Sequence, residues 1–161
     1  MIVVNTSPII TFGKQGKLDL LKQCFGKIKI PESVYREVME KKDSVESIVL
    51  ERAISENWIE VENVEINKSL NTKNLGKGEK EAITSALKNK CVVLIDDDSA
   101  KQYASILDVE AHGSLYVLYA AYMKNIIKKE EAKRIFEAMI RDGFYVSTDV
   151  YAKFLELLGG K

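Results

Sequence analysis

Short apolar runs alternate with longer amphipathic stretches along most of this chain. Runs of β-branched and other apolar residues are typical of buried strands, whereas apolar positions three and four apart are typical of helices. The runs predict five strands, at residues 2–5, 28–30, 58–61, 91–95 and 109–111. The helical spacing predicts helices within residues 9–25, 31–38, 44–56, 79–90, 100–107, 115–124, 130–141 and 148–158. This alternation predicts an α/β fold, in which helices cover both faces of a mainly parallel sheet.

Local signals mark two helix starts and one irregular segment. Pro31 follows the second strand and is expected in the first turn of its helix, where a backbone N–H is not needed. Ser44 is expected to cap the next helix through its hydroxyl. Residues 62–78 are polar and rich in turn-forming residues, which predicts a surface excursion.

The composition indicates one globular domain. The chain has 161 residues, 46% hydrophobic and 30% charged, which is enough to bury a core without disulfides. It contains no repeat and no evident linker, so we expect a single domain over residues 1–161. No segment approaches the ~20 unbroken apolar residues of a membrane span, and residues 1–4 lack the basic flank of a signal peptide. We therefore expect a cytoplasmic protein with no membrane partner.

Charge, cysteine and histidine content argue against several classes of site. Lys+Arg and Asp+Glu both number 24, so no overall positive field would attract nucleic acid, and such a partner would need local contacts or a metal ion. Cys24 and Cys91 lie far apart in apolar surroundings, which favours two buried thiols over a disulfide or a zinc site. The single histidine, His112, is expected to be a structural or surface residue.

Two predicted strands end in polar clusters. The strand at 91–95 runs directly into Asp96, Asp97 and Asp98, and the first strand runs into residues 5–7, Asn-Thr-Ser. In parallel sheets the carboxyl ends of strands share one edge, so both clusters are expected to face the same crevice. Adjacent carboxylates repel one another, which favours a compensating divalent metal. The alternative is a solvated loop in which Asp98 or Ser99 caps the next helix.

Two glutamates on predicted helices are further candidates. At ~100° per residue, Glu79 falls at the centre of the apolar stripe of its helix, whereas Glu81 points almost the opposite way. Glu79 could act in a site or could compensate the charge of the helix start, and the pattern leaves both open. Glu37 lies on the flank of the apolar face of the helix after Pro31, where the default is a solvated side chain.

With these motifs in order, the chain resembles the PIN-domain family of small α/β metal-dependent ribonucleases, which includes toxins of many bacterial and archaeal toxin–antitoxin modules. The resemblance rests on four segments, at residues 3–10, 30–37, 79–87 and 93–97. The separation of Glu79 and Asp97 matches that of the family's acidic pair, which selects Glu79 over Glu81. The segments at 76–79, 113–115 and 142–144 are more similar to a less characterised prokaryotic subgroup than to typical toxins.

The resemblance implies a three-layer α/β/α PIN-like domain and an acidic pocket that binds Mg²⁺ or Mn²⁺. By carry-over, Glu37, Glu79 and Asp97 are the metal ligands, and Asn5 stands where the family has its first catalytic aspartate. The residues expected to surround and orient these four are Thr6, Ser7, Asp96, Asp98 and Ser114. Asn5 offers an oxygen without charge, and Ser99 replaces an acid often found in the family, so the pocket has less negative charge than usual.

The expected function is metal-dependent endoribonuclease activity on RNA, of toxin type if an antitoxin protein accompanies it. The alternative, favoured by Asn5, is a catalytically silent PIN-like module that binds RNA or a protein partner. A homodimer is also expected, because PIN domains commonly pair and the helices at 115–124 and 148–158 carry more apolar residues than one buried stripe requires. The alternative is that these residues complete the core.

Overall fold

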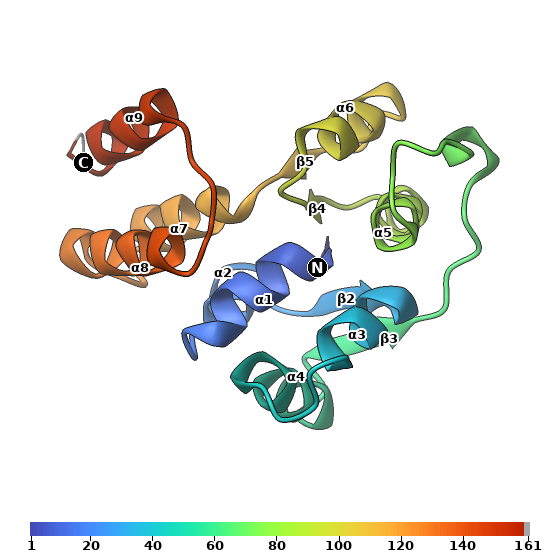
Figure 1. The fold of residues 1–161 in the computed structure, drawn as a ribbon, viewed down its shortest axis with the longest axis horizontal. Helices are drawn as coiled ribbons and strands as arrows, with labels where there is room; N and C mark the ends of the chain where they lie inside the picture. The colour runs from blue at the N-terminus through green and yellow to red at the C-terminus, as the bar shows by residue number, and fades with distance from the viewer. Residues whose placement is uncertain (160–161) are drawn as a thin grey trace.

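The computed structural model describes residues 1–159, so the last two residues of the predicted domain lie outside the described part. Its centre is a five-stranded sheet in the order β3-β2-β1-β4-β5, and every pair of neighbouring strands is parallel (Figure 1). The strands are β1 (Ile2–Val4), β2 (Ile28–Pro31), β3 (Ile59–Glu62), β4 (Val93–Leu94) and β5 (Ala111–His112). Because β1 lies in the middle, the chain builds outward from it in both directions.

Helices occupy the connections between these strands, and within residues 1–159 three more helices follow the last strand. In the described residues they are α1 (Thr6–Lys14), α2 (Asp19–Phe25), α3 (Glu32–Met39), α4 (Val45–Ser55), α5 (Lys77–Asn89), α6 (Asp98–Ile106), α7 (Ser114–Met123), α8 (Lys129–Arg141) and α9 (Thr148–Gly159), with a short 3-10 helix at Lys68–Leu70. As Figure 1 shows, α7, α8 and α9 gather at one end of the molecule. No described helix is both long and apolar enough to cross a membrane.

Two apolar cores lie on opposite faces of the sheet, which gives the predicted three layers. Side chains alternate between faces along a strand, so Val4 and Val3 enter different cores. Val4 and Leu94 pack with residues of α1–α4 and α7–α9. Val3 and Val93 pack with residues of α5 and α6. The predicted parallel α/β sandwich is therefore confirmed.

Local details differ from the sequence expectations at several points. Pro31 is the last residue of β2 and precedes α3, rather than lying in its first turn. Ser44 caps α4 as predicted, since its hydroxyl accepts the Ser47 N–H. The segment at 62–78 is not a purely solvated excursion, because Leu70 and Leu75 are buried in the core beneath α5 and α6. Isolated leucines in a polar stretch carry no periodicity, so their burial was not visible in the pattern.

Two further expectations, the buried cysteines and the apolar surface of the C-terminal helices, can be compared with the structure. Cys24 is buried and Cys91 half-buried, and both are free thiols. Several residues that suggested a dimer face belong to the chain's own core: Val117, Tyr122, Phe154 and Leu158. Exposed apolar side chains nevertheless remain on α9 at Val150, Tyr151 and Leu157.

Candidate functional site

The predicted site residues come from four elements that end or begin at one edge of the sheet. Asn5 follows β1 and its backbone N–H donates to the Leu94 carbonyl at 2.9 Å, which fixes it beside the end of β4. Asp96, Asp97 and Asp98 follow β4. Glu37 lies on α3, and Glu79 lies in the first turn of α5. The prediction of one shared edge agrees with this arrangement.

Gly78 brings two of these residues against the start of α5. A Cβ atom built on Gly78 would lie 3.0 Å from Oε1 of Glu37 and 3.3 Å from Oδ1 of Asn5. Both side-chain oxygens therefore face the backbone of α5 immediately before Glu79. Glycine favours this close approach, because a Cβ here would push one or both oxygens away by a few tenths of an ångström.

Electrostatics link three of the acids. Burial is the largest effect and raises the pKa of the Glu79 carboxyl above its ordinary range, and the negative charges of Asp97 and Glu37 raise it further. The Gly76 N–H, which donates to Oε2 of Glu79 at 2.9 Å, acts in the opposite direction. Glu79 thus interacts with the start of α5, which was one of the two alternatives for its role. It also lies close enough to Asp97 and Glu37 to feel their negative charges.

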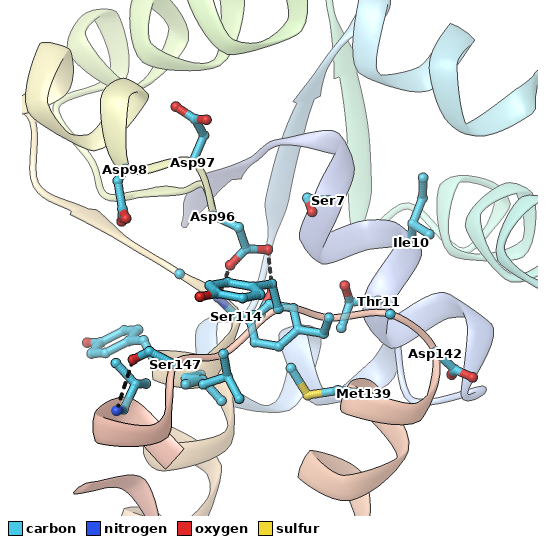
Figure 2. Close-up of a pocket in the computed structure, with 18 of the residues that line it drawn as sticks. Ser7, Ile10, Thr11, Asp96, Asp97, Asp98, Ser114, Met139, Asp142 and Ser147 are labelled. Carbon is cyan, nitrogen blue, oxygen red and sulfur yellow. Dashed lines mark hydrogen bonds between the residues drawn. The ribbon is translucent and has the colours of Figure 1, made fainter. Parts of the chain in front are cut away.

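The residue that caps α6 is Asp97, and not Asp98 or Ser99 as the solvated-loop alternative expected. Its Oδ1 accepts the Ala100 N–H at 2.8 Å. The strand β4 ends at Leu94, one residue before its predicted end at residue 95, and α6 begins at Asp98, two residues before its predicted start at residue 100. The side chain of Asp98 is 95% exposed and lies 3.9 Å from Lys101 Nζ. Figure 2 shows the three aspartate side chains pointing in different directions.

Asp96 is held by Ser114, a pair that the sequence placed around the site without predicting the contact. The Ser114 N–H and hydroxyl donate to Oδ1 and Oδ2 of Asp96 at 2.6 and 2.7 Å (Figure 2). Both carboxylate oxygens of Asp96 are therefore engaged, and Ser114 is buried. This contact ties the end of β4 to the start of α7.

Thr6 and Ser7, which follow Asn5 in the sequence, differ in exposure. Ser7 is exposed on α1. Thr6 is half-buried, and its Oγ1 is one of the buried polar atoms that have no hydrogen-bond partner in the described structure.

Glu81 is the residue that the helical pattern placed wrongly. It is only 5% exposed, and its carboxylate accepts the backbone N–H of Ser33 at 3.4 Å together with a short hydrogen bond from the Ser33 hydroxyl. Residues 81–86 of α5 are all buried, because α3 covers the side that an isolated amphipathic helix would expose to solvent. A periodicity argument assumes one solvated face, so it could not identify Glu81.

The donor types suit a hard divalent cation. Carboxylates and an amide oxygen are the ligands that Mg²⁺ and Mn²⁺ prefer. A cation would offset the negative charges of Asp97 and Glu37, which add to the effect of burial on the pKa of Glu79. Within residues 1–159, however, no three acidic, histidine or cysteine side chains converge closely enough to hold one ion. The residues present fit the chemistry of such a metal, but their side chains would have to turn toward it.

Comparison with known proteins agrees with this fold. No curated protein is significantly similar to the chain. Among solved structures, the chain is similar to a PilT N-terminus domain protein from the hyperthermophilic archaeon Sulfolobus solfataricus P2, with a TM-score of 0.51 and 16% identity. The likeness covers 75% of this chain and 93% of the other, and at this identity it shows the fold alone. A family model described as a PIN domain, DUF3368, matches residues 1–160. Since that match spans nearly the whole sequence, the chain belongs to this PIN-domain family.

Proposed function

We propose that the protein is a metal-dependent endoribonuclease that hydrolyses RNA phosphodiester bonds at the carboxyl edge of its sheet. PIN domains are generally nucleases that use divalent metal ions, which supports the class of reaction. The observation that carries the proposal is the close approach of Glu37 Oε1 and Asn5 Oδ1 to the Gly78 backbone, next to Glu79. Burial chiefly raises the pKa of Glu79, and the negative charges of Asp97 and Glu37 raise it further. Such like charges are costly without a compensating cation.

In this proposal Glu37, Glu79 and Asp97 hold Mg²⁺ or Mn²⁺, and the amide oxygen of Asn5 completes the oxygen-rich edge. When bound, the metal would activate water and offset the charge of the scissile phosphate. The Asp96–Ser114 contact fixes the loop that carries Asp97, so it orients this ligand without contacting the RNA. Gly78 leaves room for Glu37 and Asn5 beside α5.

Cleavage of end-labelled single-stranded RNA tests the proposal. Cleavage should require Mg²⁺ or Mn²⁺, stop in EDTA, and be lost in Asp97→Asn. Asp43→Asn is the control, because it removes the same charge from an exposed residue in the turn before α4, outside the proposed site. Cleavage that persists in EDTA, or that falls equally in both variants, would contradict the proposed site.

A second function is favoured by one observation, the neutral Asn5 at the position of an acid. In that case the protein is a silent PIN-like module that binds RNA or a protein partner without turnover. RNA binding by gel shift, with no cleavage at any Mn²⁺ concentration tested, would favour this module over the enzyme.

Partners and location follow as further proposals. A toxin role would require an antitoxin encoded nearby, and reading the adjacent open reading frame tests that directly.

We also propose a cytoplasmic homodimer, supported by the exposed apolar side chains of α9. Light scattering that reports a stable 18.2 kDa monomer at micromolar concentration would remove the dimer.

A further inference from the structure

A pocket of about 680 Å³ opens beside the acidic edge. One wall is α1, with Ser7 and Thr11, and another is the aspartate loop at residues 96–98. The third wall is the segment at residues 142–147, which joins α8 to α9 (Figure 2). The pocket is therefore continuous with the loop that carries Asp97, but most of its surface lies outside the four site residues.

Three aromatic residues line this pocket: Tyr116, Phe144 and Tyr145. Tyr145 is 87% exposed, the highest exposure among the large apolar side chains of the described residues, although it lies at a pocket wall. Tyr116 lines the same pocket, and its ring is fixed by stacking on His112 with centroids 3.9 Å apart and an interplanar angle of 10°. Exposed and braced aromatic faces are the surfaces on which proteins stack unpaired bases.

The remaining lining suits the other parts of a nucleotide. Lys14 and Lys101 bring positive charge to a pocket whose other charged residues are aspartates. Lys101 Nζ lies 3.9 Å from Oδ1 of the exposed Asp98 carboxylate. So long and solvated an ion pair is weak, which leaves the ammonium group able to contact a phosphate. The hydroxyls of Ser7 and Thr11 can pair with base or ribose edges.

We propose that this pocket holds one unstacked base of single-stranded RNA, with Tyr145 stacking on the base and Lys101 contacting the adjacent phosphate. The inference rests on the proposed ribonuclease function, because it places a nucleotide next to the bond that the acidic edge would cleave. A base is favoured over a peptide segment because the lining combines flat apolar faces, hydroxyls and ammonium groups. The pocket would then select which base lies beside the cleavage position.

Fluorescence anisotropy with a short labelled single-stranded oligoribonucleotide tests the proposal, in the Asp97→Asn background so that no RNA is cut. Tyr145→Ala should weaken binding about fivefold or more, because stacking is lost, whereas Tyr145→Phe should bind as before. Ile106→Ala is the matched control, since Ile106 is also exposed but does not line the pocket. An otherwise identical oligonucleotide with one abasic position should bind as weakly to the parent as the intact one binds to Tyr145→Ala.

The outcomes separate this inference from the proposed function. Binding that is unchanged in Tyr145→Ala, equal for intact and abasic RNA, or not detectable at all would overturn the base-binding pocket. Cleavage by the otherwise wild-type Tyr145→Ala chain at the wild-type rate and with the wild-type base preference would also overturn it, while leaving the nuclease intact. Tyr145-dependent binding without any Mn²⁺-dependent cleavage by the wild-type chain would keep the pocket and remove the nuclease.

Discussion

The carboxylate of Asp96 accepts two hydrogen bonds from one residue, the backbone N–H and the hydroxyl of Ser114, at 2.6 and 2.7 Å. Both bonds end on a charged acceptor in a partly buried position, and Ser114 itself is fully buried. The pair thereby joins two segments 18 residues apart. It holds the loop that presents Asp97 at a defined position relative to α7.

Ser114→Ala should therefore destabilise the protein. Removing the hydroxyl deletes one bond to a charged acceptor and leaves part of the Asp96 carboxylate without a partner, a loss of about 1.5–3 kcal/mol in the free energy of unfolding. Urea denaturation measures this value. Ser7→Ala, which removes an exposed hydroxyl, should stay within about 0.5 kcal/mol of the wild type. Equal effects of the two substitutions would mean that the Asp96–Ser114 contact does not stabilise the fold.

Glu81 is predicted to be a structural residue and not a metal ligand. Glu81→Ala should lower the free energy of unfolding by about 1–3 kcal/mol, because the Ser33 N–H and hydroxyl lose a buried partner. Glu81→Gln should be milder, since its amide oxygen still accepts a hydrogen bond. Glu137→Ala on the exposed face of α8 is the control. A melting temperature that rises with Mn²⁺ in wild type but not in Glu81→Gln would contradict this assignment.

The contrast between Glu79 and Glu81 shows what the sequence could and could not predict. The alternation of strands and helices, the parallel sheet and the position of Asn5 beside the aspartate loop all follow from apolar periodicity and from the rule for strand ends. The exposure of the two glutamates does not, because it depends on α3 packing against α5. The Asp96–Ser114 bond and the wall at residues 142–147 likewise depend on contacts between distant segments, which a local pattern does not record.

Glu79 should make the metal-free protein less stable as pH rises. Its folded-state pKa is raised above the ordinary glutamate value of 4.5, so the folded state holds the proton more tightly than the unfolded state. The stability that the Glu79 carboxyl contributes is fully present below about pH 4.5 and is lost as pH rises through its raised pKa. In EDTA, Glu79→Gln should gain melting temperature relative to wild type between about pH 4 and about pH 7. A difference that stays constant across this range would show that the pKa of Glu79 is not raised in the folded protein.

Asn5→Asp should change stability in opposite directions with and without metal. In EDTA the new carboxylate adds a like charge close to Glu37, next to Gly78, and should lower the melting temperature. In Mg²⁺ the same charge should strengthen binding of the cation and raise the melting temperature relative to wild type. Thermal melts of both proteins in both buffers provide the measurement. The same shift in both buffers would place Asn5 away from any metal and would favour the silent module.

The most direct test of the account is whether Glu79 and Asp97 bind a divalent ion together. Differential scanning calorimetry of the purified chain with and without millimolar Mn²⁺ measures it, because a ligand that binds only the folded state raises its melting temperature. The account predicts a clear upward shift in wild type and in Asp43→Asn, which changes an exposed carboxylate outside the site, and no shift in Asp97→Asn or Glu79→Gln. A shift of the same size in all four proteins, or none in wild type, would contradict a metal site at this edge of the sheet.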